Sequence, residues 1–129
     1  MPDYLLDTNI LIRHLRRHQP TTDLMAALTL NGEVGISTIT RIEMIQGMRE
    51  HERNKTLELL NSLTPYDLDS AIADLSGEYI HHYQTQGITL TIPDAIIAAT
   101  AMRYRLILVT YNAKHFPMPE LHLYKDLPL

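Results

Sequence analysis

The sequence contains no cysteine among its 129 residues. The chain therefore forms no disulfide, no zinc–thiolate site and no cysteine nucleophile, which suits a reducing cytoplasm. It also lacks any charge-free apolar stretch near the ~18 residues that a membrane span requires. Its N-terminus carries Asp3 and Asp7 where a signal peptide needs a basic start and an apolar core. We therefore expect a cytoplasmic protein without a membrane segment.

Basic residues are also few. The chain has 11 Lys and Arg against 15 Asp and Glu, which gives a net charge of −4 with histidine neutral. An acidic total argues against a protein that holds nucleic acid by bulk positive charge. The hydrophobic fraction of 45% and the charged fraction of 20% are those of a globular protein. The length fits one domain, so we expect a single domain over residues 1–129.

Short apolar runs alternate with amphipathic segments along the chain. Four runs predict strands, at residues 4–6, 34–37, 63–66 and 106–109, and a last alternating run lies at residues 121–124. Pro65 confines the third of these to an edge of the sheet or to a bend. Strands separated by helices imply a parallel sheet covered on both faces. The predicted fold class is therefore α/β.

Apolar residues at helical spacing predict helices near residues 10–15, 21–31, 40–49, 57–63, 68–83 and 93–101. The second begins at the cap Thr21-Thr22-Asp23, and Gly87 stops the long fifth helix. Pro93 starts the last helix, which is unusually rich in alanine. A helix with such small side chains can lie close against a sheet.

Three acidic residues stand out by their positions. Asp7 follows the first strand, Glu43 lies in the first turn of the helix after the second strand, and Asp94 opens the alanine-rich helix. Asn112 follows the strand at residues 106–109. Each also has a local explanation, because such residues stabilise helix starts and turns. Thr40-x-x-Glu43, for example, has the spacing of a capping box.

The positions taken together point to a cation site. The carboxyl ends of parallel strands share one edge of a sheet, where ligands bind, so the acids can meet in one cleft. Carboxylates ~4 Å apart repel by about 4 kcal/mol at an effective dielectric of about 20, so such a cluster takes up protons or binds a cation. Oxygen ligands without cysteine favour Mg²⁺ or Mn²⁺, the ions commonly used in phosphoryl transfer.

Four blocks of the sequence resemble the PIN domain family. They are Asp7-Thr8-Asn9, Ile39-Thr40-x-x-Glu43 with Gly47, the run from Pro93-Asp94-Ala95 to Ala101, and Leu108-Val109-Thr110-Tyr111-Asn112-x-x-His115-Phe116. More narrowly, the chain resembles the VapC-type toxins of type II toxin–antitoxin systems, from Tyr4 to about Tyr124. Asp-Thr-Asn alone is a weak motif, whereas the four blocks in this order form a strong one.

The resemblance implies a three-layer α/β/α sandwich with a sheet of four or five parallel strands. It also implies that Asp7, Glu43 and Asp94 bind the metal ion and form the catalytic set together with Asn112. Many members have a fourth acid at the position of Asn112. Because an amide brings no charge, the sequence leaves open whether one or two ions bind. The hydroxyls of Thr8 and Thr110 are expected to support the carboxylates.

The activity implied by the resemblance is that of an Mg²⁺- or Mn²⁺-dependent endoribonuclease. Hydrolysis would leave a 5′-phosphate and a 3′-hydroxyl, with either Asp94 or Glu43 orienting the attacking water. The implied partners are RNA, a small antitoxin whose tail covers the active site, and a second copy of the chain.

Three arginines carry a second prediction. Arg13, Arg16 and Arg17 are spaced three and four apart, so we expect them on one helix face. Two interpretations stay open: a phosphate-binding site for RNA beside the acidic cleft, or a solvated face near the negative end of the helix.

Apolar residues of the first three helices have two possible roles, either in the core or in a surface for a partner. They are Ile12, Leu15, Leu24, Met25, Ile45 and Met48.

The seven histidines are interpreted as surface residues rather than metal ligands. His14 and His18 have a chelating spacing, but no acid lies between them. His81 and His82 are adjacent and therefore point to different helix faces. His115 is expected to pack near the cleft without a catalytic role.

Three other functions are alternatives to the ribonuclease. A catalytically inactive RNA- or protein-binding module would account for Asn112. A receiver-like phosphate-transfer domain needs an adjacent acidic pair near its start, whereas Asp3 and Asp7 are not adjacent. Its phosphoacceptor would follow the third strand, where Asp67 and Asp69 follow only a weak strand. A haloacid-dehalogenase-like phosphatase needs Asp-x-Asp, which this chain lacks after its first strand.

Overall fold

The structure, a computed structural model, describes residues 3–128. Within these residues four strands form one parallel sheet in the order β3-β2-β1-β4. The strands are β1 (Tyr4–Leu6), β2 (Val34–Ser37), β3 (Thr64–Tyr66) and β4 (Ile107–Val109). Tyr4 pairs with Val34 on one side and with Ile107 on the other, so β1 is a central strand.

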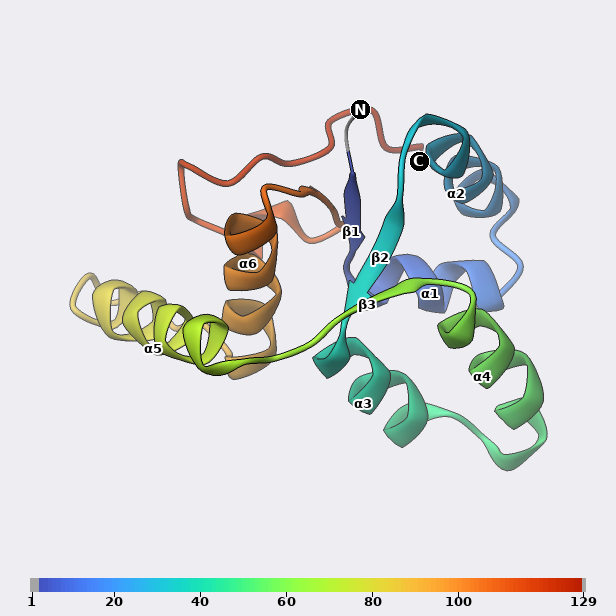
Figure 1. Ribbon diagram of the computed structural model, residues 1–129, viewed down its shortest axis with the longest axis horizontal. Helices are drawn as coiled ribbons and strands as arrows, with labels where there is room; N and C mark the ends of the chain where they lie inside the picture. The colour runs from blue at the N-terminus through green and yellow to red at the C-terminus, as the bar shows by residue number, and fades with distance from the viewer. Residues whose placement is uncertain (1–2, 129) are drawn as a thin grey trace.

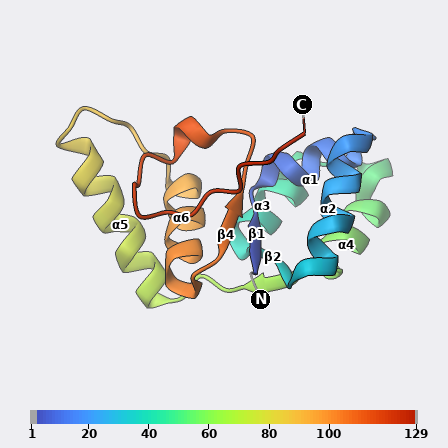
Figure 2. The ribbon, with the colours of Figure 1, turned by 90° about the horizontal axis from the view of Figure 1, so that it is seen from above.

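Helices cover both faces of this sheet. They are α1 (Thr8–Leu15), α2 (Gln19–Asn31), α3 (Thr38–Gly47), α4 (Arg53–Asn61), α5 (Ser70–Gln84) and α6 (Ile92–Tyr104), with the 3₁₀ turns η1 (Glu50–Glu52) and η2 (Ala113–His115). In Figure 1, α5 and α6 lie on one side of the sheet and α1, α2 and α4 on the other. Figure 2 shows the same layers from above. The predicted α/β/α sandwich is therefore confirmed, with four parallel strands.

Alternation along β1 divides the core between the two layers. Leu5 belongs to a cluster with Leu108 and with Ala98 of α6, whereas Leu6 packs with Ile10 of α1 and Leu28 of α2. All six side chains are at most 1% exposed. Successive residues of a strand point to opposite faces, so three residues of β1 join both helical layers to the sheet.

The connections between strands create a switch point beside β1. The chain passes from β1 to β2 and then to β3 in one direction, and it returns to the other side of β1 for β4. The backbone N–H of Asp7 donates to the carbonyl of Val109 at 2.9 Å, which joins the ends of β1 and β4. Open α/β sheets bind ligands at such a point, outside the carboxyl ends of the strands.

Most helices begin a few residues earlier than predicted, and the residues at the start of α2 and α3 explain two of these differences. The second helix starts at Gln19 rather than at the cap predicted at residues 21–23, because Pro20 fits the first turn of a helix. The third starts at Thr38, because the Ser37 hydroxyl accepts the Ile39 N–H at 3.2 Å and caps it. Glu43 consequently lies in the second turn of α3, and the capping-box interpretation of its spacing to residue 40 was wrong.

The predicted strand at residues 121–124 is reduced to a single bridge between Leu123 and Leu108. The Leu108 N–H donates to the carbonyl of His122, and the Tyr124 N–H donates to the carbonyl of Leu108, both at 2.8 Å. One bridged residue does not make a strand, so the sheet has four strands in the described residues. The fifth helix starts at Ser70 rather than at residue 68, because the Asp69 carboxylate caps it by accepting the Ile72 N–H.

Gly35 sets the spacing between β2 and β3. A Cβ at this position would lie 2.6 Å from the carbonyl oxygen of Thr64 and would overlap the ring of Tyr66. Only glycine lets the edge strand approach this closely. Pro65 lies in that edge strand, as its missing N–H predicts.

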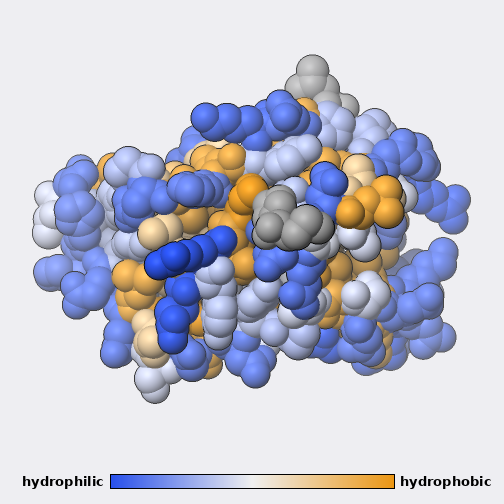
Figure 3. All heavy atoms as spheres, turned by 45° about the horizontal axis from the view of Figure 1, so that its top comes forward, coloured by the Kyte–Doolittle hydropathy of each residue, from blue (hydrophilic) through white to orange (hydrophobic). Residues whose placement is uncertain are grey.

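One face of the molecule is mostly hydrophilic (Figure 3). The face in Figure 3 shows hydrophilic side chains around smaller areas of hydrophobic ones. Large apolar side chains that remain exposed include Ile42 of α3, Leu68 before α5 and Ile92 of α6. Within residues 3–128, the helices are too short or too polar to cross a membrane.

Candidate functional site

Asp7 lies at the centre of the candidate site. It follows β1, caps α1 and is only 6% exposed. Its Oδ1 accepts the backbone N–H of Thr8 at 2.8 Å, and its Oδ2 accepts the hydroxyl of Thr110 at 2.7 Å. Because Thr110 follows β4, these contacts hold the carboxylate at the switch point.

Asn9 is a member of this site that the sequence prediction did not include. Its Nδ2 donates to Oδ2 of Asp7 at 3.2 Å and to the Thr110 hydroxyl at 3.3 Å. Its Oδ1 accepts the backbone N–H of Tyr111 at 3.2 Å. The amide therefore ties the end of β1 to the end of β4. The signal was its place two residues after the acid in the Asp-Thr-Asn motif.

Glu43 reaches the same region from α3. The hydroxyl of Thr8 donates to Oε1 of Glu43 at 2.7 Å and also lies 3.1 Å from the hydroxyl of Thr40. Thr40 is fully buried, and Glu43 is partly exposed. Thr8 thus joins two acids, since its backbone N–H binds Asp7 and its hydroxyl binds Glu43.

Asp94 comes from the first turn of α6. The Thr91 hydroxyl caps this helix by accepting the Asp94 N–H at 3.3 Å. The carboxylate of Asp94 is 20% exposed and lies 3.6 Å from Nδ1 of His115 in η2. The prediction that His115 packs near the cleft therefore agrees with the structure.

The three acids interact electrostatically. Burial raises the pKa of Asp7 above its usual value, the hydrogen bonds from Thr110 and Thr8 lower it, and the charges of Asp94 and Glu43 raise it further. Asp94 and Glu43 thus lie within electrostatic range of the buried carboxyl. Among residues 3–128, no group of three His, Asp or Glu side chains is close enough to form a metal site as it stands.

Asn112 lies beside the site and makes no hydrogen bond to its acids in the described part of the chain. Its backbone N–H donates to the Thr110 hydroxyl at 2.9 Å, and the residue immediately precedes η2. Its side chain is exposed and makes no hydrogen bond within the part of the chain that the structure describes. Its catalytic assignment stays a prediction.

The three arginines do not share a helix face, so this prediction was wrong. α1 ends at Leu15, which leaves only Arg13 inside the helix. Arg17 has φ 62°, and the N–H groups of Arg17 and His18 return to the carbonyls of His14 and Arg13. This is a Schellman ending, in which a left-handed residue terminates the helix and turns the chain away.

Each arginine has a different environment. The guanidinium of Arg13 lies over the ring of Tyr111, 3.7 Å from its centroid. Arg16 caps the end of α1 and borders a groove that also contains Glu43. Arg17 is exposed.

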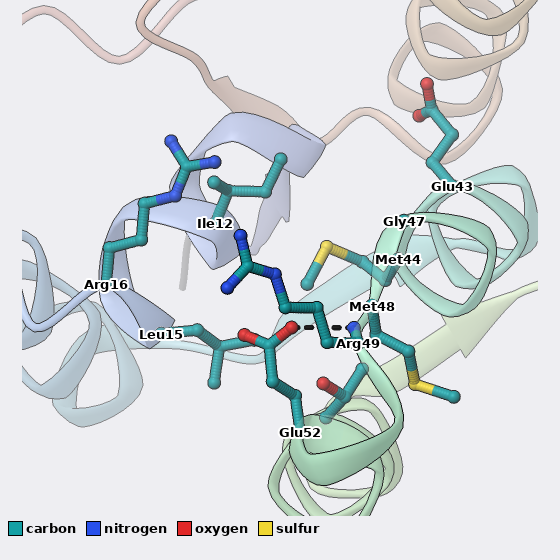
Figure 4. A pocket seen from close by; sticks show the side chains of 10 residues that line it. Ile12, Leu15, Arg16, Glu43, Met44, Gly47, Met48, Arg49 and Glu52 are labelled. Carbon is teal, nitrogen blue, oxygen red and sulfur yellow. Dashed lines mark hydrogen bonds between the residues drawn. The ribbon is translucent and has the colours of Figure 1, made fainter.

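The groove lies between α1 and the segment from α3 to α4, and it has a volume of about 430 Å³. Figure 4 shows Ile12, Leu15 and Arg16 on one side of it and Met44 and Met48 on the other. Of the apolar residues predicted to be core or partner surface, Ile12, Leu15 and Met48 line this groove. Leu24, by contrast, is buried in the core.

Arg49 and Glu52 close the end of the groove opposite Glu43. The Arg49 backbone N–H donates to Oε1 of Glu52 at 2.7 Å (Figure 4). Arg49 is exposed, whereas Glu52 is partly buried. The groove therefore combines an apolar lining with charged groups of both signs.

The structure disfavours both a receiver-like domain and a metal chelate formed by His14 and His18. Asp67 and Asp69 follow β3, which is two strands away from β1 and Asp7. The acids that a receiver-like domain would use are therefore on separate strands. His14 and His18 each hydrogen-bond a threonine of α2 instead of sharing a ligand, with Nδ1–Oγ1 distances of 2.8 and 2.6 Å.

Comparison with known proteins identifies the family. The family model described as PIN domain matches residues 4–119. Ribonuclease VapC10 of Mycobacterium tuberculosis is 34% identical over 116 residues, which cover 90% of this chain and 87% of that protein. Ribonuclease VapC19 of the same species is 36% identical, with coverages of 88% and 92%.

Solved structures give the same result. VapBC2 from Rickettsia felis, bound to a DNA fragment from its promoter, superposes with a TM-score of 0.82 at 26% identity, covering 95% of this chain and 97% of that chain. A toxin–antitoxin complex from Klebsiella pneumoniae superposes with a TM-score of 0.76 at 31% identity, covering 91% and 92%. The chain therefore belongs to the PIN domain family and is related to the VapC ribonuclease toxins of VapBC toxin–antitoxin systems.

Proposed function

We propose that this protein is an Mg²⁺- or Mn²⁺-dependent endoribonuclease and the toxin of a type II toxin–antitoxin pair. The observation that carries the proposal is the buried Asp7 carboxyl at the switch point, within electrostatic range of Asp94 and Glu43. The ribonuclease activity named for the VapC relatives supports it.

The donor set fits a hard divalent cation. Asp7, Glu43 and Asp94 offer only carboxylate oxygens, which Mg²⁺ and Mn²⁺ prefer. Burial and the two neighbouring charges raise the pKa of Asp7, so its ionised form needs a compensating positive charge. Asn112 adds no charge, and we therefore propose one ion. When bound, such an ion lowers the pKa of water and polarises a phosphate.

The surrounding residues hold the carboxylates in place. Thr110 and Asn9 both donate to Oδ2 of Asp7, which fixes the plane of that carboxyl. Thr8 holds Glu43 by its hydroxyl at 2.7 Å. Asp94 and Glu43 are the two groups that can orient the attacking water on the phosphorus atom of the RNA backbone.

The test is RNA cleavage by the wild type and by Asp94→Asn, in Mn²⁺ and then with chelator. Asn keeps the size of the side chain and removes its charge, so we expect metal-dependent cleavage by the wild type and none by the variant. Asp74→Asn is the matched control, because Asp74 is an exposed acid of α5. Equal cleavage by wild type and Asp94→Asn would reveal a contaminating nuclease and refute the site.

A second candidate is an inactive RNA- or protein-binding module, which the exposed Asn112 favours. Titration with Mn²⁺ followed by calorimetry separates the two functions. The nuclease requires binding of the ion that is lost in Asp7→Asn and Asp94→Asn, and an inactive module needs no such binding.

We further propose that the partner is a small antitoxin whose tail lies in the groove beside Glu43. The toxin–antitoxin complexes among the related structures support such a partner. An apolar segment would pack on Ile12, Leu15 and Met48, and its acidic residues would meet Arg16 and Arg49. Met48→Asp should therefore weaken the complex, measured by calorimetry with the product of a small open reading frame found next to this gene.

The assembly and location are also proposals. We propose a homodimer or a larger toxin–antitoxin assembly, and the toxin–antitoxin complexes among the related structures support this proposal. Light scattering with and without the antitoxin measures the mass. The single sheet and the family match over residues 4–119 support one domain. The absence of cysteine supports a cytoplasmic location.

A further inference from the structure

Tyr111 is held at both ends, beside the site that contains Asp7, Glu43 and Asp94. Its backbone N–H donates to Oδ1 of Asn9 at 3.2 Å, and its phenol oxygen lies 2.8 Å from the hydroxyl of Thr21. Thr21 is fully buried and is itself bound by Nδ1 of His18 at 2.6 Å. The ring of Tyr111 is therefore fixed relative to the carboxylates.

Arg13 lies on this fixed ring. Its Cζ is 3.7 Å from the ring centroid, which is a close cation–π contact. Arg13 is exposed, and within residues 3–128 its guanidinium forms neither an ion pair nor a hydrogen bond with the protein. Its position is thus restrained while its N–H donors remain free for a ligand.

The Arg13–Tyr111 pair lies next to the residues that hold the Asp7 carboxyl. Tyr111 directly follows Thr110, which binds Asp7, and Asn9 binds Asp7, Thr110 and Tyr111 together. The same residues therefore orient the central carboxyl and the ring that carries Arg13. Arg16 and Arg17 have no such support.

We propose that Tyr111 is a positioning residue that presents the Arg13 guanidinium to a phosphate of the RNA backbone beside the bond to be cleaved. This inference rests on the proposed ribonuclease function. A guanidinium binds phosphate through two parallel N–H donors, which needs a defined orientation. Restraint by the ring reduces the entropy lost on binding. In a chain of net charge −4, a fixed cation here also offsets the repulsion between the acids and RNA.

The experiment measures KM and kcat for a short fluorescent RNA at several salt concentrations. Arg13→Gln should raise KM by about tenfold or more and leave kcat nearly unchanged. The KM of the variant should also depend less on salt. The slope of log KM against log salt concentration should fall by about 0.7, the value for one phosphate contact on single-stranded nucleic acid.

Tyr111→Leu removes the aromatic face and should raise KM by about threefold to tenfold. Tyr111→Phe keeps the aromatic face but removes the hydrogen bond to Thr21, so its KM should lie between those of the wild type and Tyr111→Leu. The double variant Arg13→Gln, Tyr111→Leu should match Arg13→Gln alone, because Tyr111 acts through the guanidinium. Thermal unfolding of each variant shows separately any loss of fold.

Arg103→Gln is the matched control. Arg103 also lies over a tyrosine, with its Cζ 5.8 Å from the ring centroid of Tyr104, but at the opposite end of α6 from Asp94. We expect its KM and salt dependence to equal those of the wild type.

Additive effects of Arg13→Gln and Tyr111→Leu, or an unchanged KM in either variant, would overturn the inference. Binding of the same RNA in chelator, measured by fluorescence anisotropy, tests the phosphate contact without cleavage. A wild type that binds RNA in an Arg13-dependent manner but does not cleave it would contradict the ribonuclease and support the phosphate contact. Cleavage with Arg13-independent binding would contradict only the phosphate contact.

Discussion

Removing the charge of Asp7 should make the metal-free protein more stable. The carboxyl is 6% exposed, burial raises its pKa, and the charges of Asp94 and Glu43 raise it further. Asp7→Asn keeps an oxygen that can accept the Thr8 N–H and removes the repulsion, which is worth about 1 to 2 kcal/mol between charges beyond direct contact. Its Nδ2 replaces the acceptor of the Asn9 amide, although the Thr110 hydroxyl can rotate to accept from it, so part of this gain is offset. We therefore expect the free energy of unfolding to rise by up to about 1 kcal/mol.

The pH dependence has a definite sign. A raised pKa means that the folded state favours the protonated carboxyl of Asp7. The stabilisation that protonation gives to the folded state is therefore complete below the ordinary pKa of 3.8. It is lost as the pH rises through the folded-state pKa of Asp7. Wild type and Asp7→Asn should therefore be nearly equal in stability near pH 3. The variant should gain over the wild type as the pH increases to 7.

Adding Mn²⁺ should make the wild type more stable than Asp7→Asn at pH 7. A ligand that binds only the folded state adds about 2.7 kcal/mol at about a hundredfold excess over its dissociation constant. For a chain of this length that corresponds to an increase in Tm of about 10 °C. Asp7→Asn lacks the central ligand, so its Tm should remain within about 2 °C of the metal-free value.

Substitutions of Thr110 test the pKa of Asp7 without removing its carboxyl. Its hydroxyl lowers the pKa of Asp7, so Thr110→Val should raise that pKa and make Mn²⁺ compete with a proton up to a higher pH. Thr110→Ser keeps the donor and should restore the wild-type dependence.

The assay is urea unfolding from pH 3 to 8, with and without Mn²⁺, with Asp74→Asn as the exposed control. A metal-free Asp7→Asn protein that is less stable than the wild type at pH 7 would refute the electrostatic reasoning. Equal stabilisation of both proteins by Mn²⁺ would place the ion elsewhere.

Two further predictions concern the scaffold. Gly35→Ala forces a methyl group into the space between two strands and should reduce the free energy of unfolding by about 1 to 3 kcal/mol in urea melts, whereas Gly77→Ala, in open space within α5, should increase it by about 0.5 to 1 kcal/mol. Arg17→Gly and Arg105→Gly both relieve a left-handed residue, with φ of 62° and 56°, and should each stabilise the fold by about 1 kcal/mol. Lower RNA affinity in Arg17→Gly but not in Arg105→Gly would indicate an RNA contact at the end of α1, and equal affinities would leave Arg17 with a helix-ending role only.

The layers of the fold could be predicted because their signals are local. Apolar runs separated by amphipathic helices specify a parallel sheet with two covered faces, and Pro65 already marks an edge strand. Helix starts were less predictable because several cap residues compete. Ser37 and Thr40 both have the required side chain, and in the structure Ser37 caps α3 whereas Thr40 is buried within it.

The site was predicted in part for a related reason. Acids that follow strands are recognisable in the sequence, because strand ends share one edge. Asn9 was missed, since an amide after an acid also occurs in ordinary turns, and its role depends on a strand about a hundred residues away. The face assigned to the arginines failed because no glycine marks the end of α1, where Arg17 adopts the left-handed conformation instead.

The net charge of −4 is best understood through this arrangement. One bound divalent ion would bring the formal charge to −2, and the charge that it neutralises is concentrated at the switch point rather than spread over the surface. RNA affinity should then depend on two local cations, the ion among the acids and the guanidinium on Tyr111. Such a protein gains little from long-range attraction, so recognition of an RNA must come from contacts that form at the cleaved bond itself.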